Sequence, residues 1–180
     1  MRLVVLDRDG VINRDSADYI KSPEEWEPLE GSLDAIARLN RAGWQVVVAS
    51  NQSGLRRGLF DVETLNGIHD RMQRLLAEVG GRVEAVFFCA CLPDEGCACY
   101  KPEPGMLLDI AGRLRVSLDG VPVIGDSLRD VQAAHSAGAR PILVRTGNGE
   151  RTLAEDLHDL PEGTEVHTDL AGAVDALLAE

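Results

Sequence analysis

Three aspartates stand within three residues of the ends of short apolar runs of the sequence. Asp7 and Asp9 follow the run 3–6 and precede Gly10, and Asp126 follows the run 121–124. Carboxylates that meet in space repel one another unless a cation joins them, and all-oxygen ligands favour Mg²⁺, which also accepts phosphate oxygens. The pattern therefore predicts a magnesium site formed by Asp7, Asp9 and Asp126, although each aspartate alone is also typical of a helix N-cap or a turn.

Two aspartates at this spacing suit phosphoryl transfer. One carboxylate can attack phosphorus and form an aspartyl phosphate, while the other protonates the departing alkoxide and then accepts a proton from water. The reaction also needs a hydroxyl donor and a cation that face the transferred group. Ser50 offers the hydroxyl and Lys101 the ammonium, although a turn serine and a surface lysine are the alternative interpretations.

Alternating strands and helices must position these residues. Apolar runs predict buried strands at 3–6, 44–49, 83–88, 121–124 and 141–144, and helical periods predict helices at 33–41, 62–79, 105–114, 128–137 and 170–178. Asp61 and Asp169 suit N-caps, and Gly43 and Gly138 suit helix ends. The order predicts an α/β fold with a three-layer, Rossmann-like parallel sheet. Ligands bind beyond the carboxyl ends of such strands, where the polar residues gather.

Composition narrows the class of partner. The chain has 180 residues, of which 44% are hydrophobic, and its 18 basic and 30 acidic side chains give a net charge of −12. Proteins that bind nucleic acid carry clustered lysine and arginine, whereas a locally positive cleft in an acidic protein can still bind a small anion. No apolar stretch approaches the ~18 residues of a membrane span, and the N-terminus does not resemble a signal peptide. We expect one domain over residues 1–180, cytoplasmic and monomeric, that binds neither nucleic acid nor membrane.

All four cysteines fall within eleven residues, in the pattern Cys89-x-Cys91-x₅-Cys97-x-Cys99. Four sulfur atoms so close together fit a tetrahedral structural zinc site. A disulfide pair is the alternative, and a cytoplasmic location disfavours it. The spacing therefore predicts a zinc-binding loop at residues 89–99.

Four segments, taken in order, resemble the motifs of a known superfamily. Asp7-x-Asp9-Gly10, Ser50-Asn51, Lys101-Pro102 and Gly125-Asp126-x-x-x-Asp130 resemble the four motifs of haloacid dehalogenase superfamily phosphatases. Longer segments, at 7–13, 50–54, 57–60 and 101–106, resemble the family of D-glycero-D-manno-heptose-1,7-bisphosphate 7-phosphatases and the related histidinol-phosphate phosphatases. The resemblance covers nearly the whole chain, and it implies a haloacid dehalogenase fold without a large cap domain.

This resemblance implies a role for each matching residue. Asp7 would be the nucleophile and Asp9 the general acid and base, while Ser50 and Lys101 would hold the phosphoryl group. Mg²⁺ would be bound by the Asp7 carboxylate, the Asp9 carbonyl and Asp126, with Asp130 behind them. The implied substrate-binding residues lie in three loops: Asp15, Ser16, Asp18, Asn51, Gln52, Ser53, Arg57, Tyr100 and Lys101. Loss of zinc from the cysteine loop would loosen the segment that leads into Lys101.

The sequence departs from the family pattern at the cysteine loop and at position 100. Cys91 stands where histidine is usual, and the intervening loop is short, but four thiolates remain a valid zinc ligand set. Tyr100 stands where these phosphatases usually have arginine, and a phenol cannot pair bidentately with phosphate. Either Arg56, Arg57 or Arg129 compensates, or discrimination between bisphosphate and monophosphate substrates is relaxed.

The resemblance implies a Mg²⁺-dependent phosphatase that removes the 7-phosphate of a heptose bisphosphate in bacterial heptose (lipopolysaccharide or glycan) biosynthesis. A histidinol-phosphate phosphatase with the same catalytic residues is the second hypothesis, but arginines at 56 and 57 suit a second phosphate better than a cationic amine. A zinc-stabilised binding protein without activity is the third hypothesis, against which the intact Asp7, Asp9 and Lys101 argue.

Overall fold

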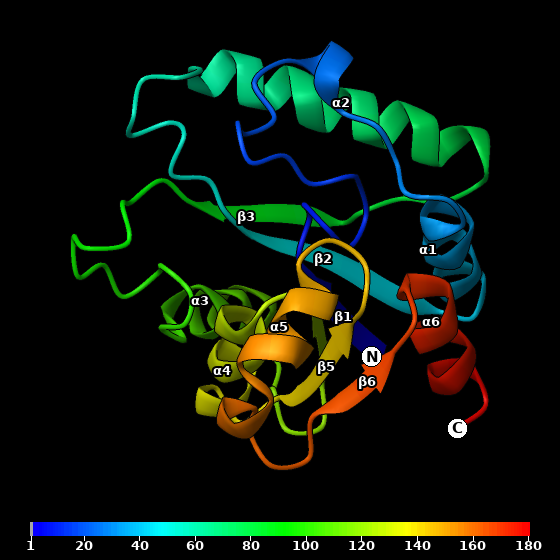
Figure 1. The fold of residues 1–180 in the computed structure, drawn as a ribbon. Coiled ribbons are helices and arrows are strands. Elements are labelled where there is room, and N and C mark those ends of the chain that lie inside the picture. Colours follow the sequence, from blue (N-terminus) through cyan, green and yellow to red (C-terminus); the bar gives the residue numbers. More distant parts are fainter. Residues whose placement is uncertain (1) are drawn as a thin grey trace.

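A six-stranded parallel sheet forms the centre of the protein in a computed structural model that describes residues 2–180 (Figure 1). The strands are β1 (Arg2–Leu6), β2 (Trp44–Asn51), β3 (Ala85–Cys89), β4 (Pro122–Gly125), β5 (Arg140–Val144) and β6 (Glu165–His167). Their order across the sheet is β3-β2-β1-β4-β5-β6, and every neighbouring pair is parallel. The order reverses between β1 and β4, which is where such sheets bind ligands.

Helices cover both faces of the sheet (Figure 1). They are α1 (Ser32–Arg41), α2 (Val62–Glu78), α3 (Gly105–Leu114), α4 (Leu128–Ser136), α5 (Gly149–Glu155) and α6 (Leu170–Leu178), with short 3-10 helices η1 (Pro23–Glu25) and η2 (Leu157–Asp159). Within residues 2–180, no helix combines the length and the apolar character that crossing a membrane requires.

The sheet has two hydrophobic cores because successive strand residues point to opposite faces. On one face, Val4 and Leu6 of β1 belong to a core with buried side chains of α1, α2 and α6. On the other face, Leu3 and Val5 belong to a core with buried side chains of α3 and α4. The predicted three-layer α/β fold is confirmed, and it leaves the loops at the carboxyl edge of the sheet free to build a site.

The predicted elements are present, with ends that differ by at most two residues. Asp61 and Asp169 cap α2 and α6 by accepting the backbone N–H groups of Thr64 and Gly172. Apart from the short 3-10 helices η1 and η2, one strand and one α-helix were not predicted. β6 has only three residues and α5 has seven, so neither is long enough to show a period in the sequence.

Candidate active site

Loops after β1, β2, β3, β4 and β5 line one cavity of about 310 Å³ at the carboxyl edge of the sheet. The five residues predicted to act together, which are distant in the sequence, all contribute to its wall: Asp7, Asp9, Ser50, Lys101 and Asp126. The predicted substrate-binding residues that join them are Asp15, Ser16, Asn51, Gln52, Ser53, Arg57 and Tyr100. Asp18 does not line the cavity; it is exposed, and its N–H donates to Ser16 Oγ at 3.1 Å.

Lys101 lies between two aspartates. Its Nζ is 3.2 Å from Asp7 Oδ1 and 2.6 Å from Asp130 Oδ1, and it donates to the carbonyl of Ala49 at 2.9 Å. Burial lowers the pKa of this ammonium, but the carboxylates of Asp130 and Asp7 raise it more, so the pKa lies above that of an ordinary lysine. The cation therefore stays charged beside the predicted nucleophile.

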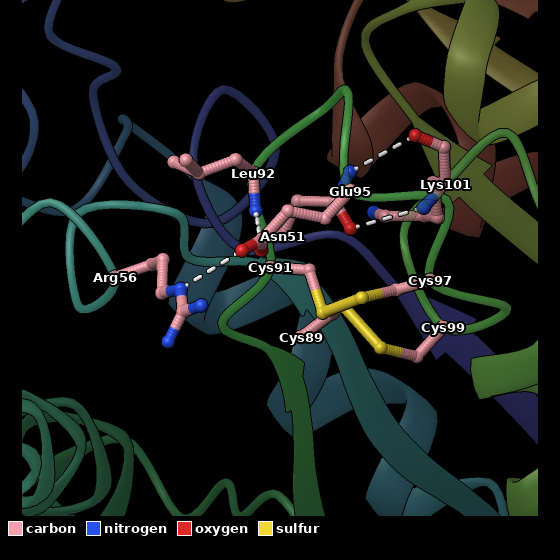
Figure 2. The surroundings of a disulfide bond; sticks show 9 residues. All are labelled: Asn51, Arg56, Cys89, Cys91, Leu92, Glu95, Cys97, Cys99 and Lys101. Carbon is pink, nitrogen blue, oxygen red and sulfur yellow. Dashed lines mark hydrogen bonds and ion pairs between the residues drawn. A yellow bond between two sulfur atoms is a disulfide. The ribbon is translucent and has the colours of Figure 1, made fainter.

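Asn51 fixes the backbone of Lys101 to the end of β2. Its Nδ2 donates to the Lys101 carbonyl and its Oδ1 accepts the Lys101 N–H, both at 3.1 Å (Figure 2). This reciprocal pair satisfies two backbone groups of a loop with one side chain. Asn51 was predicted to bind substrate, and the structure also gives it a direct part in placing Lys101.

Four side-chain donors surround the carboxylate of Asp9. Arg8 donates through Nε (2.9 Å) and Nη2 (3.1 Å), Asn13 through Nδ2 (2.8 Å) and Gln52 through Nε2 (3.2 Å). Burial opposes ionisation, but the Arg8 guanidinium and these hydrogen bonds hold the pKa of Asp9 below its usual value. Arg8 is fully buried, and its Nη1 lies 3.1 Å from His69 Nε2. Its place between the two aspartates of the motif was the only sequence signal for this contact.

Around Asp7 and Asp126 the carboxylates outnumber the one ammonium group, that of Lys101. Carboxylate oxygens of Asp7, Asp126 and Asp130 all lie within 4.8 Å of one another. Burial and the neighbouring carboxylates raise the pKa of Asp7 to about 7 and that of Asp126 to about 8. Carboxylates that are costly to ionise together are the oxygen donors that a divalent cation stabilises, so this donor set fits Mg²⁺.

Asp130 is already engaged by protein donors. Besides the Lys101 ammonium, its carboxylate accepts the N–H groups of Asp126 (3.2 Å) and Ser127 (3.0 Å) and the Ser127 hydroxyl (2.7 Å). The bond from the Ser127 N–H belongs to the capping box of α4. Its pKa is lowered because Lys101 and these hydrogen bonds outweigh burial. This agrees with a place behind the metal ligands.

Asn148, which the sequence did not single out, holds the Asp126 carboxylate, and Gly10, the glycine of the first motif, leaves room for it. The Asn148 N–H donates to Asp126 Oδ2 at 2.7 Å, and its Nδ2 lies 3.2 Å from the same oxygen and 2.9 Å from Asp15 Oδ2. Gly10 has φ +84°, and a Cβ there would overlap the Asp126 carboxylate. The position of Asn148 in the loop between β5 and α5, at the carboxyl edge of the sheet, was the signal that could have identified it.

The cysteine loop carries its four sulfur atoms as two disulfides, which join Cys89 to Cys99 and Cys91 to Cys97 (Figure 2). The structure thus differs from the predicted set of four free thiolates and shows the disulfide alternative. The sulfur atoms of Cys89, Cys91 and Cys99 nevertheless lie within 4.8 Å of one another, a spacing compatible with a metal site. The prediction that the four cysteines lie close together is therefore confirmed.

A salt bridge joins this loop to the segment after β2. Glu95 Oε1 accepts Arg56 Nε at 2.9 Å, and Glu95 Oε2 accepts the Leu92 N–H at 2.7 Å (Figure 2). The guanidinium of Arg56 is thereby engaged outside the cavity, whereas its neighbour Arg57 lines it.

Known proteins resemble this chain over its whole length. Residues 98–173 match the HAD-hydrolase-like family and residues 3–127 match the polynucleotide kinase 3 phosphatase family. The chain is 61% identical over 180 residues to the D-glycero-beta-D-manno-heptose-1,7-bisphosphate 7-phosphatase of Bordetella bronchiseptica (100% of this chain, 99% of that protein). It is 51% identical over 178 residues to the protein of the same name from Pseudomonas putida (99% and 100%). The chain belongs to this family of HAD-like phosphatases.

Solved structures of the family agree with the fold. The crystal structure of the D,D-heptose 1,7-bisphosphate phosphatase from B. bronchiseptica, complexed with magnesium and phosphate, has a TM-score of 0.97 and 60% identity over 99% of both chains. The corresponding structure from Burkholderia thailandensis has a TM-score of 0.81 and 50% identity over 100% of both chains. The resemblance predicted from the motifs is confirmed, as is the haloacid dehalogenase type of fold.

Proposed function

We propose that this protein hydrolyses the 7-phosphate of D-glycero-β-D-manno-heptose 1,7-bisphosphate in a Mg²⁺-dependent reaction. The contact that carries the proposal is Asp7 Oδ1 with Lys101 Nζ at 3.2 Å, next to Asp126 and inside the cavity. The names of relatives that are 61% and 51% identical support this substrate and its β anomer. The product, a heptose 1-phosphate, suits bacterial heptose biosynthesis.

Asp7 and Asp9 divide the chemistry between them. A carboxylate oxygen of Asp7 attacks phosphorus, the bond between phosphorus and the sugar oxygen breaks, and Asp9 gives its proton to the leaving alkoxide. Asp9 then takes a proton from water, which attacks the aspartyl phosphate, releases inorganic phosphate and restores Asp7. Arg8 lowers the pKa of Asp9, so the carboxyl group is ionised in the free protein. A negatively charged phosphoryl group in the cavity would raise this pKa, and we therefore expect Asp9 to gain its proton when the substrate binds.

Ser50 and Lys101 hold the phosphoryl group during both steps. Ser50 is buried, and its Oγ accepts Gln52 Nε2 at 2.8 Å, which leaves the hydroxyl hydrogen free to donate to a phosphoryl oxygen. Mg²⁺, held by the Asp7 and Asp126 carboxylates and the Asp9 carbonyl, would supply positive charge to the transferred group. Lys101, whose Nζ lies 3.2 Å from Asp7 Oδ1, adds a second positive charge.

A panel of substrates tests the proposal. Phosphate release is measured with heptose bisphosphate, sugar monophosphates and histidinol phosphate, with and without Mg²⁺, for the wild type and for Asp7→Asn. We expect the highest kcat/KM for the bisphosphate, no turnover without Mg²⁺, and loss of turnover in Asp7→Asn while circular dichroism shows the fold intact. A preference for histidinol phosphate would support the second hypothesis, and absence of phosphate release from every substrate would support the third.

The cysteine loop holds a structural zinc ion when its thiols are reduced. The gathered sulfur atoms support this proposal, since four thiolates form a complete tetrahedral ligand set. Zinc content and free thiols per chain, measured on protein purified under reducing conditions, distinguish zinc from the two disulfides. If zinc-free protein kept full turnover with Mg²⁺ present, the predicted role of zinc in positioning Lys101 would be wrong. The cytoplasmic location and the monomeric state stay predictions.

A further inference from the structure

Two arginines line the cavity in addition to the phosphoryl centre. Arg57 lies in the loop after β2, and Arg129 lies in the first turn of α4. In the described residues, 2–180, no salt bridge joins either of them to a carboxylate. In a chain with a net charge of −12, two cations without a carboxylate partner at one cavity point to an anionic ligand.

Tyr100 holds Arg129 in place. Arg129 Nη1 donates to the Tyr100 hydroxyl at 2.8 Å, and the guanidinium carbon lies 5.8 Å from the centroid of the Tyr100 ring. The tyrosine side chain is buried and directly precedes Lys101, so one short segment carries both the phosphoryl-binding lysine and the support for Arg129. A guanidinium has five N–H donors, and this contact leaves most of them for a ligand.

The position of Arg129 on its helix also favours an anion. It is the second residue of α4, where the free backbone N–H groups and the helix dipole make the surroundings positive. A cation is normally unfavourable there, and the capping acceptor Asp130 is already bound to Lys101. Arg129 and the helix end therefore attract the same negatively charged group.

We propose that Arg129, supported by Tyr100, binds the phosphate of the substrate that is not hydrolysed. This inference rests on the proposed function. It makes Arg129 the residue that takes over the role of the arginine that relatives usually carry at position 100. Arg56 is excluded from that role because Glu95 engages it outside the cavity. A planar guanidinium pairs bidentately with phosphate, which the phenol of Tyr100 cannot do. Arg129 is thus a specificity-determining residue and Tyr100 is its positioning residue.

The test compares two substrates in matched variants. For Arg129→Met we expect kcat/KM for heptose 1,7-bisphosphate to fall about 10- to 100-fold, mostly through KM, because a charge-assisted contact to a distant phosphate is lost. For the same heptose with only the 7-phosphate, we expect a change below about threefold. Arg129→Lys keeps the charge without the planar fork and is expected to lie between the wild type and Arg129→Met.

Tyr100→Phe separates support from binding. It keeps the ring and removes the hydroxyl acceptor, so we expect a loss of about three- to tenfold for the bisphosphate alone. Combined with Arg129→Met, it is expected to cause no additional loss, since the hydroxyl acts only through the arginine.

Arg113→Met is the matched control. Arg113 lies on α3, where it is exposed, pairs with Asp109 and has its guanidinium carbon 5.7 Å from the centroid of the Phe87 ring. It does not line the cavity, so we expect kcat/KM to stay at the wild-type value for both substrates. An equal loss for both substrates in Arg129→Met, or no loss, overturns the inference. If Arg129→Met does not fold, the inhibition constant of heptose 1-phosphate is compared between Arg129→Lys and the wild type. An unchanged inhibition constant contradicts the inference. If the wild type hydrolyses neither substrate, the proposed function fails instead.

Discussion

Replacing Asp130 with asparagine tests whether the buried pair with Lys101 holds the centre of the site together. The two charged atoms lie 2.6 Å apart, and both side chains are almost fully buried, with 3% of Asp130 and 5% of Lys101 exposed. The substitution keeps the size of the side chain but removes its charge. It also replaces one acceptor oxygen by an NH₂ group in a place where four donors converge.

The expected loss of stability depends on the partners that Lys101 keeps when Asp130 is replaced. Breaking a buried ion pair by removing one member costs about 3–5 kcal/mol, because the other charge is left without compensation. Lys101 keeps Asp7 at 3.2 Å and the Ala49 carbonyl at 2.9 Å, which places the expected loss near the lower limit, at about 3 kcal/mol. For a chain of 180 residues, this corresponds to a melting temperature lower by roughly 6–12 °C.

Urea denaturation at pH 7 measures the free energy of unfolding, and a thermal melt gives the second value. Asp109→Asn is the control, since it makes the same chemical change in an exposed (i, i+4) pair with Arg113 and should alter stability by less than about 0.5 kcal/mol. A change below about 1 kcal/mol in Asp130→Asn would refute the reasoning, because the lysine would then be stabilised by something other than this carboxylate.

Two further predictions concern the metal-binding aspartates. Without metal, the pKa of Asp7 is about 7 and that of Asp126 about 8, so at pH 6 both carboxyl groups hold protons that Mg²⁺ must displace. We therefore expect the affinity for Mg²⁺ to rise at least about tenfold from pH 6 to pH 8, with proton release measured by calorimetry. A pH-independent affinity would contradict this prediction. Gly10→Ala is expected to weaken Mg²⁺ binding and to lower the melting temperature, because the new Cβ would overlap the Asp126 carboxylate and the backbone there has φ +84°. Gly43→Ala is the control, since Gly43 also has positive φ but a Cβ there would meet no atom within 4 Å. The difference between the two variants measures the effect of the overlap alone.

The sequence predicted the fold and the location of the site more fully than its internal contacts. Five strands and five helices were identifiable because apolar runs and helical periods report burial directly. The rule that ligands bind at strand ends then brought Asp7, Ser50 and Asp126 together correctly. The bidentate contact of Arg8 with Asp9 was not predictable, since the position of an arginine between two aspartates does not show which of them it contacts or that it is buried. The orientation of Arg129 toward Tyr100 depends on how two loops pack, which spacing alone does not encode.

Two carboxylates at the cavity each have a cation of their own, although the chain as a whole is acidic. Arg8 neutralises Asp9 from a fully buried position, and Lys101 neutralises Asp130. The remaining pair of metal-binding aspartates has raised pKa values, which a divalent cation would offset. None of these compensations uses the two arginines of the cavity wall, so their charge stays available. Although the whole chain has a net charge of −12, the cavity offers positive charge at two places that suit two phosphates: one beside Lys101 and one beside the arginines.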